Sequence, residues 1–218
     1  RDHSIEWNSW MARPSHLPEH LHPTYWTASE AIRAVETRDP TRPLFLWMSF
    51  ARPHSPYDPP QAYWDMYVDH PHIPAAHVGD WAARYDRPVA DVNAPRTRRS
   101  DREIHRGRAG YYGNISFIDH QIGRVLYEYG KRDPEGLANT LIVFTSDHGY
   151  MMGDHHHWRK TYPYEGSARI PFVVQWPTAW GEDVPRGQIL NEPIELRDIM
   201  PTFLDAAGLD APDSVDGE

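Results

Sequence analysis

The stretch that decides the fold runs from Thr140 to Gly149 and has the sequence Thr-Leu-Ile-Val-Phe-Thr-Ser-Asp-His-Gly. Its first part is a short, unbroken apolar run, which is typical of a strand buried on both faces of a sheet. An acidic residue, an imidazole and a glycine follow where this strand ends. Ligands of open α/β sheets collect at the carboxyl ends of strands, so the stretch indicates a functional site as well as a fold.

Two further apolar runs have the same character, one at 43–50 and one at 170–176. Both are short and bounded by charged residues or prolines, as buried strands are. Three such strands predict a mainly parallel sheet.

Helices are expected between and around these strands. Apolar residues recur at intervals of three and four within 109–130, which predicts an amphipathic helix that begins near Ala109. A second helix is expected at 27–37 with Thr27 as its N-cap, and a third at 195–207. Strands that alternate with helices make α/β the expected fold class.

The stretch 53–108 breaks this alternation, because it is rich in Pro, Asp, His and Arg. We interpret it as an insertion in one partial domain that spans 1–218, with a short helix at 61–68. Six arginines lie within 96–108. They predict a solvated loop, with an anion-binding segment as the alternative.

Composition excludes several classes of partner. The 218 residues carry 22 Lys+Arg against 31 Asp+Glu, a formal net charge of -9, which disfavours nucleic acid and anionic membranes. No apolar run approaches the roughly 18 residues that a membrane-spanning helix needs. Cysteine is absent, which excludes disulfides and thiolate-bound zinc and leaves the localisation open. The sequence begins at Arg1 without an initiator Met, so we expect a piece of a longer protein.

Asp147 and His148 are the first candidates for chemistry. A carboxylate oxygen and an imidazole nitrogen suit a divalent cation, and Gly149 would let the backbone turn sharply beside them. The alternative from these residues alone is a helix cap with a hydrogen-bonded histidine.

The motifs around this pair resemble those of the sulfatases, in the alkaline phosphatase superfamily. In chain order they are Arg-Pro-His-Ser-Pro at 52–56, the helix segment 111–125, Thr-Ser-Asp-His-Gly at 145–149, Gly-Asp-His at 153–155, Trp-Arg-Lys at 158–160, Tyr-Glu-x-x-x-Arg-x-Pro at 164–171 and Asp-x-x-Pro-Thr-Phe-Leu at 198–204. The resemblance extends from about Arg42 onward. It implies an alkaline-phosphatase-like fold, incomplete here, and a hydrolase of sulfuric esters such as aryl sulfates.

The resemblance also implies a role for each matching residue. Asp147 and His148 would be metal ligands. Lys160 would bind a sulfate oxygen and neutralise the charge that develops on the leaving group. His54 would contact the sulfate and donate a proton to the departing alcohol. His155 would lie near the metal ligands and contact the substrate. An ion pair between Arg169 and Glu165 is expected to be structural.

The resemblance implies two cofactors. One is a single divalent cation, and the imidazole of His148 makes Mn²⁺ an alternative to Ca²⁺. The other is a formylglycine nucleophile, which the family makes from Cys or Ser in the motif Cys/Ser-x-Pro/Ala-x-Arg. No Cys is present and no Ser fits the motif, so the nucleophile is expected outside this chain. The chain alone is therefore expected to be inactive and to self-associate through truncated surfaces.

Two alternatives to a sulfatase remain open. One is a phosphonate or phosphate ester hydrolase of the same superfamily. The other is a non-catalytic remnant that binds an anion, a metal or a partner. The presence of His54, Asp147, His148 and Lys160 together favours a hydrolase over a remnant.

Overall fold

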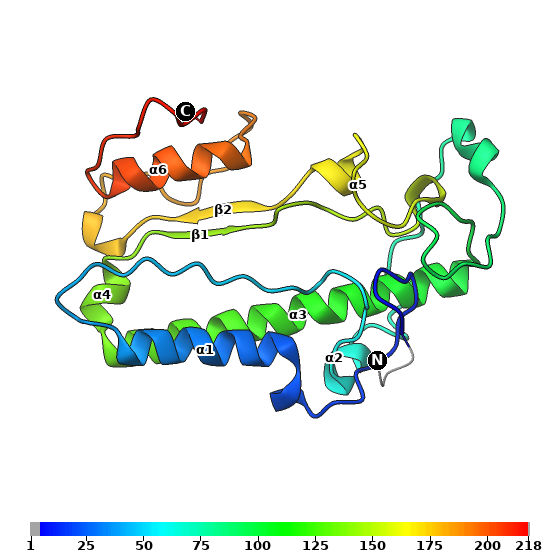
Figure 1. Ribbon diagram of the computed structural model, residues 1–218, viewed down its shortest axis with the longest axis horizontal. Helices are drawn as coiled ribbons and strands as arrows, with labels where there is room; N and C mark the ends of the chain where they lie inside the picture. The colour runs from blue at the N-terminus through cyan, green and yellow to red at the C-terminus, as the bar shows by residue number, and fades with distance from the viewer. Residues whose placement is uncertain (1–4, 218) are drawn as a thin grey trace. The chain divides into compact units, whose positions relative to one another are not determined.

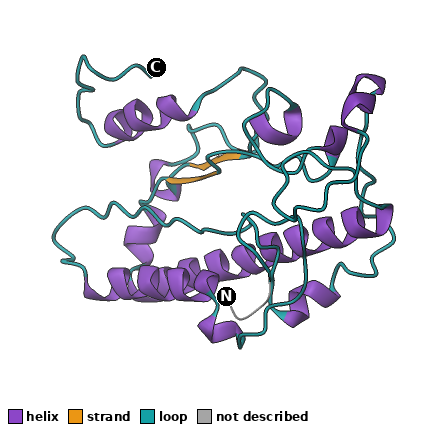
Figure 2. Ribbon diagram, turned by 45° about the vertical axis from the view of Figure 1, so that its right-hand side comes forward, coloured by secondary structure: helices purple, strands orange, loops and turns teal. Residues whose placement is uncertain are grey.

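The computed structural model describes residues 5–217, and the chain divides into two compact units. The first unit comprises residues 1–134 and 148–169, and the second comprises residues 135–147 and 170–218. Figure 2 shows that long loops join most of the helices. No helix in the described part of the chain has the length and apolar character needed to cross a bilayer.

The first unit is built on one long helix. Its helices are α1 (Pro23–Thr37), α2 (Gln61–Asp65), α3 (Asp101–Arg132) and α5 (Glu165–Ala168), with short 3-10 helices at Glu19–Leu21, Asp80–Tyr85 and Asp154–His156. Helices α1 and α2 both pack against α3, and Figure 1 shows α1 alongside it. Ala28 and Ala31 of α1 meet Val125 of α3 in a buried apolar cluster. The apolar spacing that predicted α3 therefore marks the face of α3 that packs against α1.

Helix α3 begins at Asp101, eight residues before the predicted start near Ala109. A capping box fixes this start: the backbone N–H of Glu103 donates to the Ser100 hydroxyl oxygen at 3.3 Å, and its carboxylate accepts from the Ser100 backbone N–H at 2.9 Å. The second half of the arginine-rich segment is thus helical. The solvated-loop interpretation is wrong there, and Arg108 is buried.

Helix α1 also begins earlier than predicted. His22 is its N-cap, since its Nδ1 accepts a hydrogen bond from the backbone N–H of Thr24 at 3.2 Å, and Pro23 occupies the first helical position. The predicted N-cap, Thr27, lies inside the helix and its hydroxyl donates to the Pro23 carbonyl. An imidazole as N-cap lies outside the usual Ser, Thr, Asp and Asn set, which is why the sequence signal was missed.

The second unit contains the strands β1 (Ile142–Thr145) and β2 (Phe172–Gln175), with the helices α4 (Pro134–Ala138) and α6 (Ile199–Ala206). Further 3-10 turns lie at Thr178–Trp180 and Leu196–Asp198. The helix predicted at 195–207 is therefore present, and Gly208 follows it with a left-handed φ of 69°.

The strand pairing corrects one expectation. β1 and β2 pair antiparallel, with Ile142 opposite Gln175, so the parallel arrangement predicted for these runs is wrong within the described residues. The run 43–50 forms no strand in the part of the chain that the structure covers. Phe45 and Trp47 are 70% and 73% exposed, so this run has the composition of a buried strand without a partner strand beside it.

Candidate active site

The first unit brings His54 and Lys160 together. Lys160 Nζ lies 2.8 Å from His54 Nε2, although 106 residues separate them in sequence. Both side chains are part-buried. The two residues that the sequence assigned to the sulfate are therefore hydrogen-bonded partners.

The proton positions of this pair follow from its neighbours. His54 Nδ1 lies 2.9 Å from the carbonyl oxygen of Ser55, which can only accept, so Nδ1 carries the proton. His54 Nε2 then accepts from the Lys160 ammonium. Burial lowers the pKa of His54, the charge of Lys160 lowers it further, and the Ser55 hydrogen bond opposes both. The pair thus holds one proton between a cation and a neutral imidazole.

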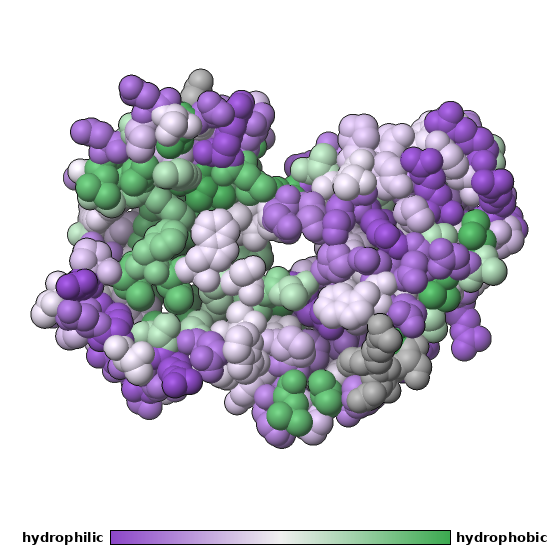
Figure 3. Space-filling model, in the orientation of Figure 1, coloured by the Kyte–Doolittle hydropathy of each residue, from purple (hydrophilic) through white to green (hydrophobic). Residues whose placement is uncertain are grey.

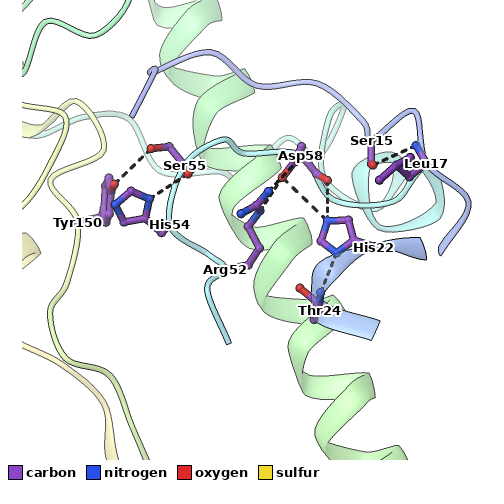
Figure 4. Close-up of polar contacts among 9 residues, drawn as sticks. All are labelled: Ser15, Leu17, His22, Thr24, Arg52, His54, Ser55, Asp58 and Tyr150. Atoms are coloured by element: carbon purple, nitrogen blue, oxygen red, sulfur yellow. Dashed lines mark hydrogen bonds and ion pairs between the residues drawn. The ribbon is translucent and has the colours of Figure 1, made fainter. Parts of the chain in front are cut away.

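A buried ion pair fastens the loop that carries His54. Arg52 Nε donates to Asp58 Oδ1 at 2.7 Å and Arg52 Nη2 donates to Asp58 Oδ2 at 3.0 Å, with the two side chains only 7% and 1% exposed. His22 Nε2 donates to the Asp58 carbonyl at 3.3 Å, as Figure 4 shows. A bidentate pair fixes relative orientation as well as distance. Both ends of the loop, 52 and 58, are therefore held while His54 projects between them.

Tyr150 is a site residue that the sequence analysis missed. Its buried ring meets the His54 ring edge-on, with centroids 5.5 Å apart, and Lys160 Nζ lies 5.6 Å from its centroid. Its hydroxyl lies 3.4 Å from Ser55 Oγ, a contact drawn in Figure 4. Its position directly after Asp-His-Gly was the available signal, because a large side chain there must lie beside the strand-end site.

Two further tyrosines support this ring from behind. Tyr57 and Tyr111 each lie with ring centroids 6.1 Å from Tyr150. Burial raises the pKa of Tyr57 well above its ordinary value and raises the pKa of Tyr111 to about 12. Both hydroxyls stay protonated at neutral pH, so the wall behind His54 and Lys160 is uncharged and rigid.

Gly149 allows another segment of backbone to approach closely, whereas the sequence predicted that it allows a sharp turn. A Cβ at this position would lie 2.3 Å from the carbonyl oxygen of Gly166, and the Gly149 N–H donates to the Ser167 carbonyl at 2.8 Å. No side chain fits in that space. The glycine therefore lets α5 lie directly against the segment that carries His148 and Tyr150.

His148 has the tautomer of a metal-binding histidine. Its Nδ1 lies 2.9 Å from the Gly149 carbonyl oxygen, so Nδ1 carries the proton and Nε2 has the lone pair. Metal-bound histidines commonly donate their other N–H to such a carbonyl. With the carboxylate of Asp147, the donor chemistry fits a divalent cation. Within residues 5–217, however, no group of three or more His, Asp or Glu side chains could hold one.

His155 lies in a different set of contacts. Its Nδ1 accepts from the Gly79 N–H at 3.0 Å, and its ring packs on Trp81 with centroids 4.6 Å apart. Its neighbour Asp154 accepts from Arg108 Nη2 at 2.7 Å. These contacts tie Asp154 and His155 to α3 and to the proposed insertion, and the predicted contact of His155 with substrate stays a prediction.

The comparisons with known proteins agree with these motifs. The family model described as Sulfatase matches residues 6–209. The chain belongs to the sulfatase family. Among its relatives, an arylsulfatase of Clostridium perfringens is 48% identical over 221 residues, which cover 99% of this chain and 44% of that protein. A choline-sulfatase of Rhizobium meliloti is 31% identical over 172 residues, covering 77% of this chain and 32% of that protein.

A solved structure shows the same fold. The phosphonate monoester hydrolase of Agrobacterium radiobacter superposes with a TM-score of 0.78 at 26% identity, covering 98% of this chain and 44% of that one. The α/β alkaline-phosphatase-like class predicted from sequence is thereby confirmed. The chain spans less than half the length of these sulfatase relatives. Sulfatases in general use a divalent metal and a formylglycine.

Proposed function

We propose that the enzyme containing this chain hydrolyses sulfuric esters of the arylsulfatase type, and that this chain supplies the side of the active site that receives the leaving alcohol. The observation that carries the proposal is the 2.8 Å contact between Lys160 Nζ and His54 Nε2. The motifs assign both residues to the sulfate, and the fold brings them together. The substrate is a sulfate ester.

Lys160 would stabilise charge. Its ammonium is fixed between His54 and the face of Tyr150, so it needs little reorganisation when a sulfate oxygen arrives. Negative charge grows on the bridging oxygen as the S–O bond breaks, and a fixed cation at hydrogen-bond distance stabilises that charge. Lys160 thus lowers the barrier by binding the transition state more tightly than the ester.

The pair would also supply the proton that the departing alkoxide or phenoxide takes up. One proton lies between Lys160 Nζ and His54 Nε2, and the leaving oxygen becomes the stronger base as the S–O bond breaks. The proton moves to that oxygen and the alcohol departs neutral. The Ser55 carbonyl keeps the imidazole proton on His54 Nδ1, so Nε2 is the ring nitrogen that faces the shared proton of Lys160.

Two groups would complete the site. Asp147 and His148 would be ligands of one divalent cation, Ca²⁺ or Mn²⁺, which when bound polarises the sulfate as a Lewis acid. The formylglycine nucleophile lies outside this chain in the proposal.

A phosphonate or phosphate monoester hydrolase is the second candidate. It is favoured by the 0.78 TM-score to a phosphonate monoester hydrolase. The 48% identity to an arylsulfatase over 99% of the chain favours sulfate more strongly.

The test is turnover of an aryl sulfate and an aryl phosphonate ester by the full-length enzyme. We expect the sulfate to be the better substrate, and Lys160→Ala to lower its kcat/KM by about 10²- to 10³-fold. Lys131→Ala, an exposed lysine of α3, is the control. A higher kcat/KM for the phosphonate would select the second candidate.

Metal content, measured by elemental analysis, tests the cation ligands separately. Asp147→Ala should lose most bound metal, because a carboxylate ligand is removed. His148→Asn should retain metal and shift preference from Mn²⁺ toward Ca²⁺. Full metal occupancy and a normal rate in Asp147→Ala would show that the cation lies elsewhere.

A further inference from the structure

Two tyrosines that follow Lys160 form an aromatic surface with a tryptophan from the proposed insertion. Tyr164 stacks on Trp81, with centroids 5.3 Å apart and planes 23° apart, and Tyr162 lies nearly parallel to Tyr164 at 6.4 Å and 28°. Trp81 remains 42% exposed. We call Trp81, Tyr162 and Tyr164 the aromatic shelf.

The shelf is held in place by two histidines. The His155 ring packs on Trp81 at 4.6 Å, and the His157 ring meets Tyr162 edge-on at 4.4 Å. Both histidines are anchored, since His155 Nδ1 accepts from the Gly79 N–H and His157 Nδ1 donates to the His155 carbonyl. Aromatic rings held this way offer a large contact area at little cost in conformational entropy.

Two exposed arginines lie over the shelf and the neighbouring Tyr85. The Arg96 guanidinium lies 5.0 Å from the Tyr85 centroid and 5.5 Å from that of Tyr162, and the Arg84 guanidinium lies 4.8 Å from Tyr85 and 6.0 Å from Trp81. Within the described residues, neither forms an ion pair with a carboxylate.

The adjacent arginines differ in this respect. Arg98 pairs with Asp86 at 3.2 Å, and Arg99 lies 3.8 Å from Glu103. Cations spread over aromatic faces keep their charge available for an anion, whereas paired ones do not. The positive charge at the shelf is therefore uncompensated by the protein's own carboxylates.

The shelf adjoins the proposed ester site. Only Thr161 separates Tyr162 from Lys160, and an extended chain spans at most about 3.6 Å per residue, so their Cα atoms lie within about 7 Å. A backbone bridge between Arg96 and His157 ties the arginine segment to the same stretch. Lys160 and the shelf residue Tyr162 therefore stand on one short segment of backbone.

We propose that the aromatic shelf is the subsite for the organic part of the substrate, and that it takes a six-membered ring bearing a second anionic group. The ring, aryl or pyranose, packs against the exposed part of Trp81, and the second anion meets Arg96 and Arg84. The proposal rests on the proposed function, because it places the ester itself at Lys160 and His54. It goes further by naming the alcohol that this site prefers.

Steady-state kinetics of the full-length enzyme test the ring. The substrates are phenyl sulfate, glucose 6-sulfate and ethyl sulfate, and the variants are Trp81→Ala, Trp81→Phe and the control Trp26→Ala, which removes an exposed tryptophan of α1. For Trp81→Ala, the ratio of kcat/KM for a ring ester to that for ethyl sulfate should fall about threefold to tenfold, mainly through KM. Trp81→Phe should restore much of it. An unchanged ratio overturns the proposal, and whichever ring ester shows the larger fall identifies the ring.

A second arm tests the anion and does not need turnover. Binding of benzene-1,3-disulfonate, measured by isothermal titration calorimetry, should weaken in Arg96→Gln and in Trp81→Ala but not in Arg33→Gln, a control at an exposed arginine of α1. Equal binding by the wild type and the three variants overturns the proposal that the shelf binds an anionic ring. If no sulfate ester is turned over while this binding pattern holds, the proposed function fails and the shelf stands.

Discussion

The two units of the chain use their apolar residues in opposite ways. In the first unit, buried side chains surround the site, and the charged pair Arg52–Asp58 lies among them. In the second unit, Val173 of β2 is 58% exposed, and Pro177 is the one buried residue within 135–147 and 170–217. Figure 3 shows hydrophobic residues gathered over the region of α6 and the two strands.

The difference shows what an apolar pattern specifies. Backbone hydrogen bonds and local spacing are enough to form β1, β2 and α6. These local interactions do not bury the apolar faces of the strands and the helix, which require packing against other segments. In the first unit that cover comes from segments far apart in sequence, such as α1 on α3 and the 52–58 loop against Tyr150.

The largest effect is expected from the buried ion pair between Arg52 and Asp58 in the first unit. Arg52→Met removes the bidentate cation from the buried Asp58 carboxylate, and we expect the free energy of unfolding to fall by about 3–5 kcal/mol. Urea unfolding of the full-length protein measures it. The double variant Arg52→Met with Asp58→Leu should recover most of the loss, because no buried charge remains.

The matched control is the predicted pair Arg169–Glu165, which the structure confirms at 3.3 Å with side chains 81% and 82% exposed. Arg169→Met should cost less than about 1 kcal/mol, since solvent screens an exposed pair. Equal losses from Arg52→Met and Arg169→Met would contradict the role given to burial at the 52–58 loop.

Tyr150 gives a smaller effect, on activity. Tyr150→Leu removes the ring that supports Lys160 and His54, and we expect kcat/KM for an aryl sulfate to fall by about 10²-fold through misplacement of the pair. Tyr150→Phe keeps the ring and loses the hydroxyl, whose contact with Ser55 is long at 3.4 Å, so its kcat should remain within about threefold of wild type. If the Phe variant loses as much kcat as the Leu variant, the hydroxyl acts rather than the ring.

How much of the fold the sequence predicted depended on whether the signal was local. The helices at 27–37 and 195–207 and the strands near 140–145 and 170–176 were found because their apolar spacing is local. The start of α3 was missed because the arginines of 96–108 masked the Ser100 capping box. Strand direction and the missing strand at 43–50 depend on partners distant in sequence, which spacing does not identify.

For the site, the motifs predicted residue types, and the structure supplied their partners. The contact between His54 and Lys160 fits the roles inferred from their motifs. The Arg52–Asp58 pair and the Tyr150 wall were not predicted, because an ion pair or ring contact leaves no periodic pattern in sequence. The same holds for the shelf, since Trp81 and Tyr164 are 83 positions apart.

The exposed strand pair predicts association of the isolated 218-residue chain. Val173→Lys places a charge on the exposed apolar face of β2, and we expect the self-association constant to fall about tenfold, because about 1.5 kcal/mol of valine burial is lost. Sedimentation equilibrium measures it. Tyr127→Lys, at an exposed position of α3, is the control and should leave association unchanged. A chain that is monomeric at every concentration would remove the basis of this prediction.

The smallest effect concerns pH and a residue of the first unit. Burial lowers the pKa of His157 below its ordinary value of 6.5, the nearby charge of Arg96 lowers it further, and the hydrogen bond to His155 opposes both. The unfolded chain therefore binds a proton more readily than the folded one. The contribution of His157 to the folding stability is fully present above pH 6.5 and is lost as the pH falls through the lowered pKa of the folded state. The titratable and charged groups that face this ring are Tyr85, Tyr162, Tyr164, Arg96, His155 and His156.

His157→Gln removes the titrating group while keeping a donor for the His155 carbonyl. Between about pH 7 and pH 5 the variant's Tm should fall less steeply than that of wild type, by about 2 °C over the interval. Thermal unfolding of the full-length protein followed by circular dichroism measures this slope. His70→Gln, at an exposed histidine of the same unit, is the control. If His157→Gln and His70→Gln change the slope equally, burial of His157 is not what makes the first unit sensitive to acid, and the contrast between buried and exposed side chains does not extend to the histidines that hold the shelf.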